Sequence, residues 1–169
     1  MTTGHTSPAA ILTRARITLI ATAVFVAALD LGVRNWARQA LNDGSATDLG
    51  LLKLRLAFNP GVAFSLGDAL PPVALLGITG VVLVALAVFA VRVTRTATSL
   101  PVMLALAAML GGAIANLLDR AGDGLVTDYL HTGWFPTSNL ADVFVVTSAA
   151  VLVVASCRAS DTANTRSRA

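Results

Sequence analysis

The sequence contains no glutamate, one lysine and one cysteine among its 169 residues. A single cysteine, Cys157, excludes an internal disulfide and a paired-cysteine redox site, and we expect it to be a small buried apolar side chain. With only His5 and His131, a haem held between two intramembrane histidines has no ligands. Charged residues make up only 12% of the chain, against about 25% in typical soluble domains, so we do not expect a water-soluble fold.

Apolar residues dominate instead. They make up 56% of the chain, and the mean hydropathy of +0.76 is too high to come from one long apolar segment. A pI near 10.0 would suggest nucleic acid binding in a soluble protein, but a net charge of +3 spread in basic pairs makes no continuous basic face. We read these pairs as membrane topology signals and expect no nucleic acid partner.

Four apolar runs are long enough to cross a bilayer, which takes about 20 residues each. The first could be a signal peptide, but Asp30 and Arg34 follow it directly and the rest of the chain is also apolar, so we interpret it as an uncleaved span. The sequence therefore predicts an all-α membrane protein with four transmembrane helices, at residues 17–31, 71–91, 100–118 and 140–157.

Basic residues near the ends of the runs predict the orientation. Seven arginines and one aspartate lie on the side of the termini, whereas five basic residues and eight of the nine aspartates lie on the other side. By the positive-inside rule both termini are expected to be cytoplasmic. We divide the chain into a disordered cytoplasmic tail, a four-span membrane domain and a cytoplasmic tail, at residues 1–13, 14–158 and 159–169.

The extracytoplasmic loops contain some predicted structure of their own. Residues 49–58 include an alternating stretch, 52–56, which is typical of a short strand with one apolar face. Residues 33–41 place Trp36 between two arginines, which favours a short helix at the depth of the lipid headgroups. Trp134 and Tyr129 are also expected to be interfacial aromatic residues.

Four aspartates lie at the margins of the spans, where a carboxylate is costly. Asp142 follows Asn139 by three residues, a spacing that helix capping alone would explain. Asp119 could simply pair with Arg120 or close a helix. Asp128 lies in an apolar, β-branched stretch without such a role, so it needs a partner. If Asp128 and Asp142 lie side by side, one holds a proton near neutral pH, as in an aspartic hydrolase.

Five blocks then occur in the order of a known family. The chain resembles signal peptidase II, the lipoprotein signal peptidase of bacterial cytoplasmic membranes, from about residue 30 to residue 154. It differs from the usual pattern at Ser138, at Tyr129 and at Arg34, where lysine is usual. The blocks are Asp30-Leu31-Gly32-Val33-Arg34, Asn59-Pro60-Gly61-Val62-Ala63-Phe64-Ser65, Gly111-Gly112-Ala113-Ile114-Ala115-Asn116-Leu117-Leu118-Asp119-Arg120, Val126-Thr127-Asp128-Tyr129 and Asn139-Leu140-Ala141-Asp142.

The resemblance implies an aspartic endopeptidase that cleaves diacylglyceryl-modified prolipoproteins just before the lipidated cysteine. It implies Asp128 and Asp142 as the catalytic pair, and Asp30 and Arg34 as supporting residues. We expect a monomer in the cytoplasmic membrane, surrounded by phospholipid, with the active site at the extracytoplasmic face. The residues implied to bind or orient the substrate are Asn59, Gly61, Asn116, Asp119, Arg120 and Asn139.

Two other functions fit part of the pattern. A small transporter could use Asp30, Asp119, Asp128 and Asp142 as a proton relay, but it would need acids near the bilayer midplane, where these helices are apolar. An intramembrane protease of the presenilin type needs Gly-x-Gly-Asp on a span, and the sequence offers only the loop order at residues 122–124. No cofactor motif is present, and carboxylates without histidine or cysteine nearby predict no metal site.

Overall fold

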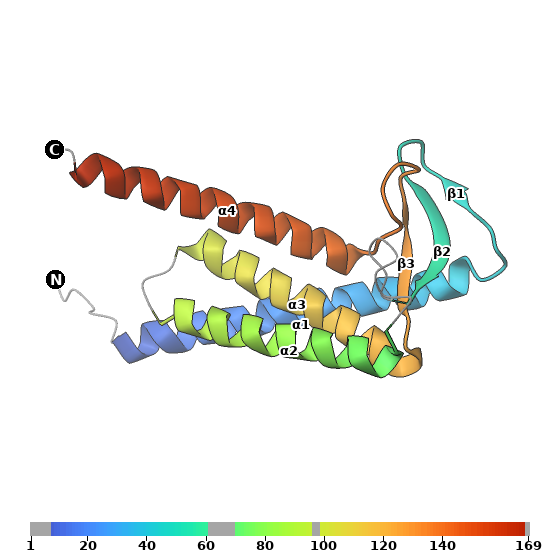
Figure 1. Ribbon diagram of the computed structural model, residues 1–169, viewed down its shortest axis with the longest axis horizontal. Coiled ribbons are helices and arrows are strands. Elements are labelled where there is room, and N and C mark those ends of the chain that lie inside the picture. The colour runs from blue at the N-terminus through green and yellow to red at the C-terminus, as the bar shows by residue number, and fades with distance from the viewer. Residues whose placement is uncertain (1–7, 61–69, 96–98, 168–169) are drawn as a thin grey trace, which may run out of the picture.

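Four long helices form a bundle that carries a small sheet at one end (Figure 1). The computed structural model describes residues 8–60, 70–95 and 99–167. We call the end with the sheet the sheet end, and the end where α1 begins and α4 finishes the terminal end (Figure 1). The elements are α1 (Pro8–Ala40), β1 (Thr47–Asp48), β2 (Lys53–Asn59), α2 (Pro72–Val93), α3 (Leu100–Asp123), β3 (Val126–His131) and α4 (Leu140–Ser167).

Each helix is long and apolar enough to cross a membrane, which confirms the four predicted spans. The candidate spans are Leu12–Ala40, Pro72–Val93, Leu100–Asp123 and Leu140–Thr162. The second and fourth expose most of their apolar side chains, as helices facing lipid do.

Helix α3 is the centre of the bundle and packs against the other three helices. Its buried face consists of small residues and leucines, among them Leu106, Ala107 and Leu110. Gly111 and Gly112 let the backbones approach closely: an added Cβ would lie 2.5 Å from the Ala23 carbonyl oxygen at Gly111 and 2.8 Å from the Ala141 carbonyl oxygen at Gly112. Small residues are the usual means of tight helix packing in lipid, where no hydrophobic effect drives association.

The sheet is antiparallel, in the order β1-β2-β3. The predicted strand is confirmed in β2, and β3 is a partner that the sequence analysis did not assign. Gly124, at a φ of 83°, ends α3 in the left-handed conformation that glycine favours and turns the chain directly into β3. Ala57 of β2 pairs with Asp128 of β3, so Asn59, two residues along, is a diagonal neighbour of Asp128 on the same face.

The chain returns from β3 to α4 through a short loop that is fixed by backbone pairing. Ser138 exchanges hydrogen bonds with Leu130, at 2.8 and 3.0 Å, and its carbonyl also accepts the Tyr129 N–H at 3.0 Å. This pairing brings Asn139 and the start of α4 back beside β3. The short interval between Asp128 and Asp142 is therefore a closed turn of the chain.

Both helices at the terminal end are longer than predicted. Residues 8–13, assigned to a disordered tail, already belong to α1, because Pro8 is favourable in a first turn and good helix formers follow. Residues 159–167, assigned to the other tail, continue α4. No glycine or proline interrupts them, and the hydroxyls of Ser160, Thr162 and Thr165 bond to carbonyls four residues back.

Three other local predictions were wrong. Residues 33–40 are not a separate interfacial helix but the last part of α1, because Arg34 is buried inside the protein. Tyr129 is buried, since its hydroxyl accepts the Leu140 N–H at 3.1 Å, whereas Trp36 and Trp134 are exposed as expected. Cys157 is exposed on α4, where an apolar thiol can face lipid.

The two close helix contacts predict which glycines the fold requires. Replacing Gly111 with valine should destabilise the protein by about 2 kcal/mol, because the new side chain must displace α1. Gly80→Val on α2 is the matched control, since nothing lies within 4 Å of that position. Thermal unfolding in detergent measures both, and equal melting temperatures for the two variants would contradict this account of the packing.

Candidate active site

Every described residue that the sequence analysis assigned to the site lies at the sheet end. Asp30 and Arg34 come from α1, Asn116, Asp119 and Arg120 from the last turns of α3, and Asn59 from the end of β2. Asp128 lies on β3, and Asn139 and Asp142 stand at the start of α4. Gly61 lies outside the described residues. Five elements thus meet at one place, although the residues span more than 110 positions in the sequence.

Asp128 is almost completely buried, with an exposed fraction of 1%. One carboxylate oxygen, Oδ1, accepts a hydrogen bond from Asn139 Nδ2 at 2.7 Å, and the other, Oδ2, accepts one from Asn59 Nδ2 at 3.2 Å. Burial raises the pKa of Asp128 to about 6, with the nearby charge of Asp142 adding to the rise and the two asparagine donors opposing it. Asp128 therefore changes its protonation close to physiological pH.

Asp142 occupies the first turn of α4 and forms a reciprocal cap with Asn139. Asn139 Oδ1 accepts the Asp142 N–H at 3.0 Å, and Asp142 Oδ2 accepts the Asn139 N–H at 3.2 Å. The other carboxylate oxygen, Oδ1, accepts a hydrogen bond from Asn116 Nδ2 at 2.9 Å. The capping role considered from the sequence is therefore real, and it fixes the rotamer of Asp142 while leaving it beside the rest of the cluster.

Asn139 connects the two carboxylates. Its side-chain oxygen binds the Asp142 backbone, and its side-chain nitrogen binds the Asp128 carboxylate. Asn139 itself is fully buried. Because an amide offers an acceptor and two donors on one rigid plane, this one side chain sets the relative orientation of both acids. The predicted convergence of Asp128 and Asp142 agrees with these contacts.

Arg34 holds the rest of the cluster together. Its Nε donates to Asp30, its Nη1 donates to Asp119 Oδ2 at 2.6 Å, and its Nη2 donates to Asn116 Oδ1. Asp30 and Arg34 are both buried, and the second Asp30 oxygen accepts the Ala141 N–H of α4 at 2.7 Å. The planar guanidinium can serve three acceptors in fixed directions, which a lysine ammonium cannot match.

Arg38 and Thr127 also belong to the cluster, and the sequence analysis did not assign them. Arg38 donates to Asp119 Oδ1 at 2.9 Å through Nη2 and to the Thr127 hydroxyl at 2.8 Å through Nε, while the Thr127 N–H donates to Asp119 Oδ2 at 2.6 Å. Asp119 therefore pairs with two arginines of α1 and not with the adjacent Arg120. Asp30, Arg34 and Arg38 are spaced four residues apart, which puts them on one helix face. This spacing could have identified Arg38 as a member of the cluster from the sequence.

Arg120 has a buried Nε without a hydrogen-bond partner among the described residues. Such donors are rare in folded proteins, because an unpaired buried N–H costs about 1–3 kcal/mol. Arg120 also lies within electrostatic reach of Asp128 and Asp142. A donor in this position is free to bind a group that enters the site from outside the described chain.

An apolar pocket of about 280 Å³ opens beside the cluster. Asp142 is the one ionisable residue in its wall, and the others come from α4 and from the loop after β3. Trp134 and Phe135 pack edge to face in that loop. Among residues 8–60, 70–95 and 99–167, no three His, Cys or Asp side chains converge as metal ligands.

The raised pKa of Asp128 predicts a pH-dependent stability. The folded state keeps the Asp128 proton up to about pH 6 but the unfolded state only up to about 3.8, so the free energy of unfolding falls as pH rises through this window, by about 3 kcal/mol. Asp128→Asn lacks this ionisation and should lose less stability between pH 5 and pH 7 than the unchanged protein. Melting temperatures across that range give the comparison, and parallel curves would contradict the assignment.

Comparison with known proteins shows which family the chain resembles. The family described as Signal peptidase (SPase) II matches residues 22–158. A lipoprotein signal peptidase of Rhodococcus jostii is 34% identical over 159 residues, covering 89% of this chain and 78% of the relative. A lipoprotein signal peptidase of Streptomyces griseus is 32% identical over 153 residues, covering 86% of this chain and 76% of the relative.

Solved structures share the fold. A bacterial membrane enzyme determined by the in meso method at 2.3 Å resolution has a TM-score of 0.73 at 24% identity, covering 87% of this chain and 90% of the other. A second such enzyme, at 1.9 Å resolution, has a TM-score of 0.70 and covers 82% of this chain and 91% of the other. With its four apolar helices, this chain is a multi-pass membrane protein and a peptidase: it belongs to the signal peptidase II family.

Proposed function

We propose that the protein removes the signal peptide from diacylglyceryl-modified prolipoproteins, cleaving before the lipidated cysteine with Asp128 and Asp142 as an acid/base pair. The carrying observation is the link through Asn139, which binds both residues while burial raises the pKa of Asp128 to about 6. Family membership supports the substrate class. Asp119 and Asp142 lie at the sheet-end termini of α3 and α4 and Asp128 lies on β3, so these acids do not form a proton relay across the membrane, although Asp30 lies inside α1.

The pair can run hydrolysis with one shared proton. In the resting enzyme we assign that proton to Asp128, whose pKa is raised. Asp142 takes a proton from water, and the oxygen of that water attacks the scissile carbonyl while Asp128 donates its proton to the carbonyl oxygen. The tetrahedral intermediate then collapses: the C–N bond breaks as Asp142 gives its proton to the leaving amine, and a hydroxyl of the intermediate returns a proton to Asp128 as the carbonyl re-forms, so the pair again holds one proton. Apparent pKa values for activity belong to the pair as a whole.

Neighbouring groups provide the contacts that a bound peptide needs. Asn59, Asn116 and Asn139 bring neutral amides to the two carboxylates without altering their charge. Arg120 Nε, which lacks a partner among the described residues, can donate to a substrate carbonyl. The apolar pocket beside Asp142 offers hydrocarbon-lined space to the lipid of the modified cysteine.

The charge distribution supports an extracytoplasmic active site. Arginines gather at the terminal end, among them the exposed residues Arg14, Arg16, Arg92 and Arg95, and the positive-inside rule makes this end cytoplasmic. The sheet end then faces outward, where a prolipoprotein anchored by its signal helix presents its cleavage site. Trp134, with an exposed fraction of 83%, can lie at the lipid headgroups of that face.

Neutralising either catalytic carboxyl should stop cleavage without unfolding the protein. Asp128→Asn and Asp142→Asn should each lower kcat/KM about a thousandfold, because one half of the acid/base pair is lost. Asparagine at position 142 can still accept the Asn139 N–H, so α4 keeps its cap. Cleavage of a lipid-modified precursor by the purified protein in detergent measures the loss.

Asp43→Asn is the matched control, since Asp43 is exposed in the loop after α1 and accepts a local hydrogen bond from the Ser45 N–H. It should retain full activity. Normal processing by either catalytic-pair variant, in a strain without another copy of the enzyme, would refute the proposal.

The pH profile should follow the Asp128 carboxyl. Because the resting enzyme needs the shared proton, kcat/KM should fall as pH rises above about 6. The Asn59 donor stabilises the charged form of Asp128, so Asn59→Ala should raise its pKa and move the falling limb to higher pH. Asn42→Ala, in the exposed loop after α1, should leave the limb in place. A shift to lower pH, or the same shift in both variants, would contradict the assignment.

A further inference from the structure

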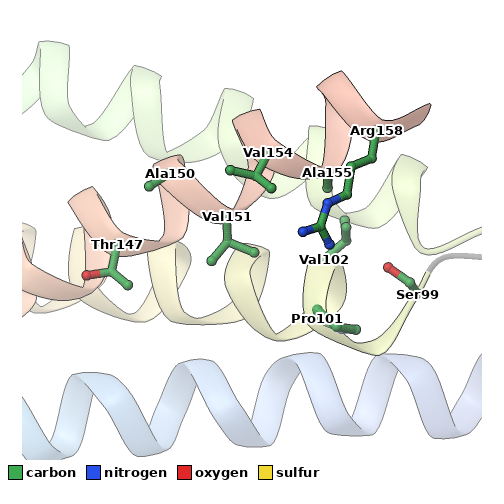
Figure 2. A pocket seen from close by; sticks show the side chains of 9 residues that line it. All are labelled: Ser99, Pro101, Val102, Thr147, Ala150, Val151, Val154, Ala155 and Arg158. Carbon is green, nitrogen blue, oxygen red and sulfur yellow. The ribbon is translucent and has the colours of Figure 1, made fainter. Parts of the chain in front are cut away.

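A second apolar groove opens toward the terminal end and shares one lining residue, Thr147, with the pocket beside Asp142. It runs between the start of α3 and the middle of α4 and has a volume of about 510 Å³ (Figure 2). Its walls are small apolar side chains, including Val102, Ala150, Val151 and Ala155. Polar side chains occur only at the two ends of the groove: Thr147 at one end, Ser99 and Arg158 at the other.

The groove exists because α3 and α4 separate. At Gly112 the two helices are so close that an added Cβ would contact Ala141 and Val145 of α4. Toward the terminal end α4 moves away from α3 (Figure 1), and the short alanines at 150 and 155 leave the space between them open. In a bilayer such a space cannot stay empty, since hydrocarbon fills apolar gaps at the protein surface.

The length of the groove matches one leaflet. From Thr147 to Arg158 is 11 helical residues, or about 16 Å along α4 at 1.5 Å per residue. The hydrocarbon core of a bilayer is about 30 Å thick, so one leaflet contributes about 15 Å. The groove therefore reaches from the level of the headgroups to the midplane, which is the extent of one acyl chain.

The side chains at the terminal end of the groove, which we call its mouth, favour a ligand with a negative charge. Arg158 is exposed, makes no ion pair with any described carboxylate, and extends from α4 toward the first turn of α3 (Figure 2). Ser99 begins α3 without a side-chain capping bond, so its hydroxyl is available at the same mouth. An arginine and a hydroxyl at headgroup depth suit a phosphate group.

Other exposed arginines near the groove strengthen its preference for an anionic ligand. Arg14, Arg16, Arg92 and Arg95 are also exposed at the terminal end, whereas Asp161 is the one acid described there. The same charge disfavours the signal helix of a substrate, because the segment before its apolar run is itself basic. A second copy of this chain would bring its own arginines to the same level.

We propose that this groove binds one acyl chain of an anionic glycerophospholipid, with Arg158 and Ser99 holding its phosphate group. The bound lipid fills the gap between α3 and α4 in the leaflet nearest the termini. None of the groove residues belongs to the proposed catalytic pair or its hydrogen-bond partners, although Thr147 also lines the apolar pocket beside Asp142.

Native mass spectrometry of the full-length protein tests the site. The protein, purified in detergent, is mixed with equal amounts of phosphatidylglycerol and phosphatidylcholine carrying identical chains. Retained phosphatidylglycerol should exceed phosphatidylcholine about fivefold, as expected for one arginine at a lipid surface. Arg158→Gln should abolish this preference, and Arg158→Lys should keep it.

Arg16→Gln is the matched control, because it removes the same charge from exposed α1 outside the groove. A second variant, Ala155→Phe, fills the groove at a half-buried position and should lower the retention of both lipids. Peptidase activity in detergent should be unchanged in all four variants, so failure here is distinguishable from failure of the catalytic proposal.

Three outcomes would overturn the site. The first is an equal loss of preference in Arg158→Gln and Arg16→Gln, which would indicate a diffuse basic surface. The second is unchanged lipid retention in Ala155→Phe. The third is capture of a prolipoprotein signal helix, in place of lipid, by a photo-crosslinker at position 155, which would assign the groove to the substrate.

Discussion

The arrangement of the site depends on the guanidinium of Arg34. It binds Asp30 one turn earlier on α1, Asp119 and Asn116 on α3, and through Asn116 it reaches Asp142 on α4. Asp30 in turn accepts the Ala141 N–H at the start of α4. Three helices are thereby fixed in rotation and height by one side chain. A buried ion pair of this kind adds little net stability, but it penalises every other register of the helices, because any slip leaves a buried charge unpaired.

The same residues serve secondary structure and chemistry. Asn139 and Asp142 form an ordinary capping box, yet the Asn139 amide also holds Asp128, and the second Asp142 oxygen receives Asn116. Because caps are rigid and local, a carboxyl that is also a cap, such as the proposed catalytic Asp142, needs few further contacts to stay oriented. The pairing of Ser138 with Leu130 completes the arrangement by returning the chain to β3 after a short loop.

Charge balance explains how so many ionisable groups tolerate a membrane margin. With the one proton that we propose Asp128 and Asp142 share, the four aspartates and three arginines named below hold three negative and three positive charges; Asp123, 3.7 Å from Arg38, adds one more negative charge that is half-exposed. Adding a second proton to the Asp128–Asp142 pair, or removing its one proton, would leave a net charge in a poorly solvated place, which costs free energy. The proton that hydrolysis needs is thus also the one that balances the cluster. The charged members are Asp30, Asp119, Asp128 and Asp142 with Arg34, Arg38 and Arg120.

The sequence by itself determined the four spans and the strand near residue 53, because apolar runs and period-two alternation are local properties, and its motif order singled out the proposed site residues. Only the tertiary structure decided which acids meet. Asp119 is adjacent to Arg120 but pairs with Arg34 and Arg38, and Tyr129 is buried against the start of α4. β3, the extended α1 and the exposure of Cys157 were also decided there. Each of these features depends on residues far away in the chain or on the surrounding lipid. The neighbouring residues in the sequence do not specify either of these environments.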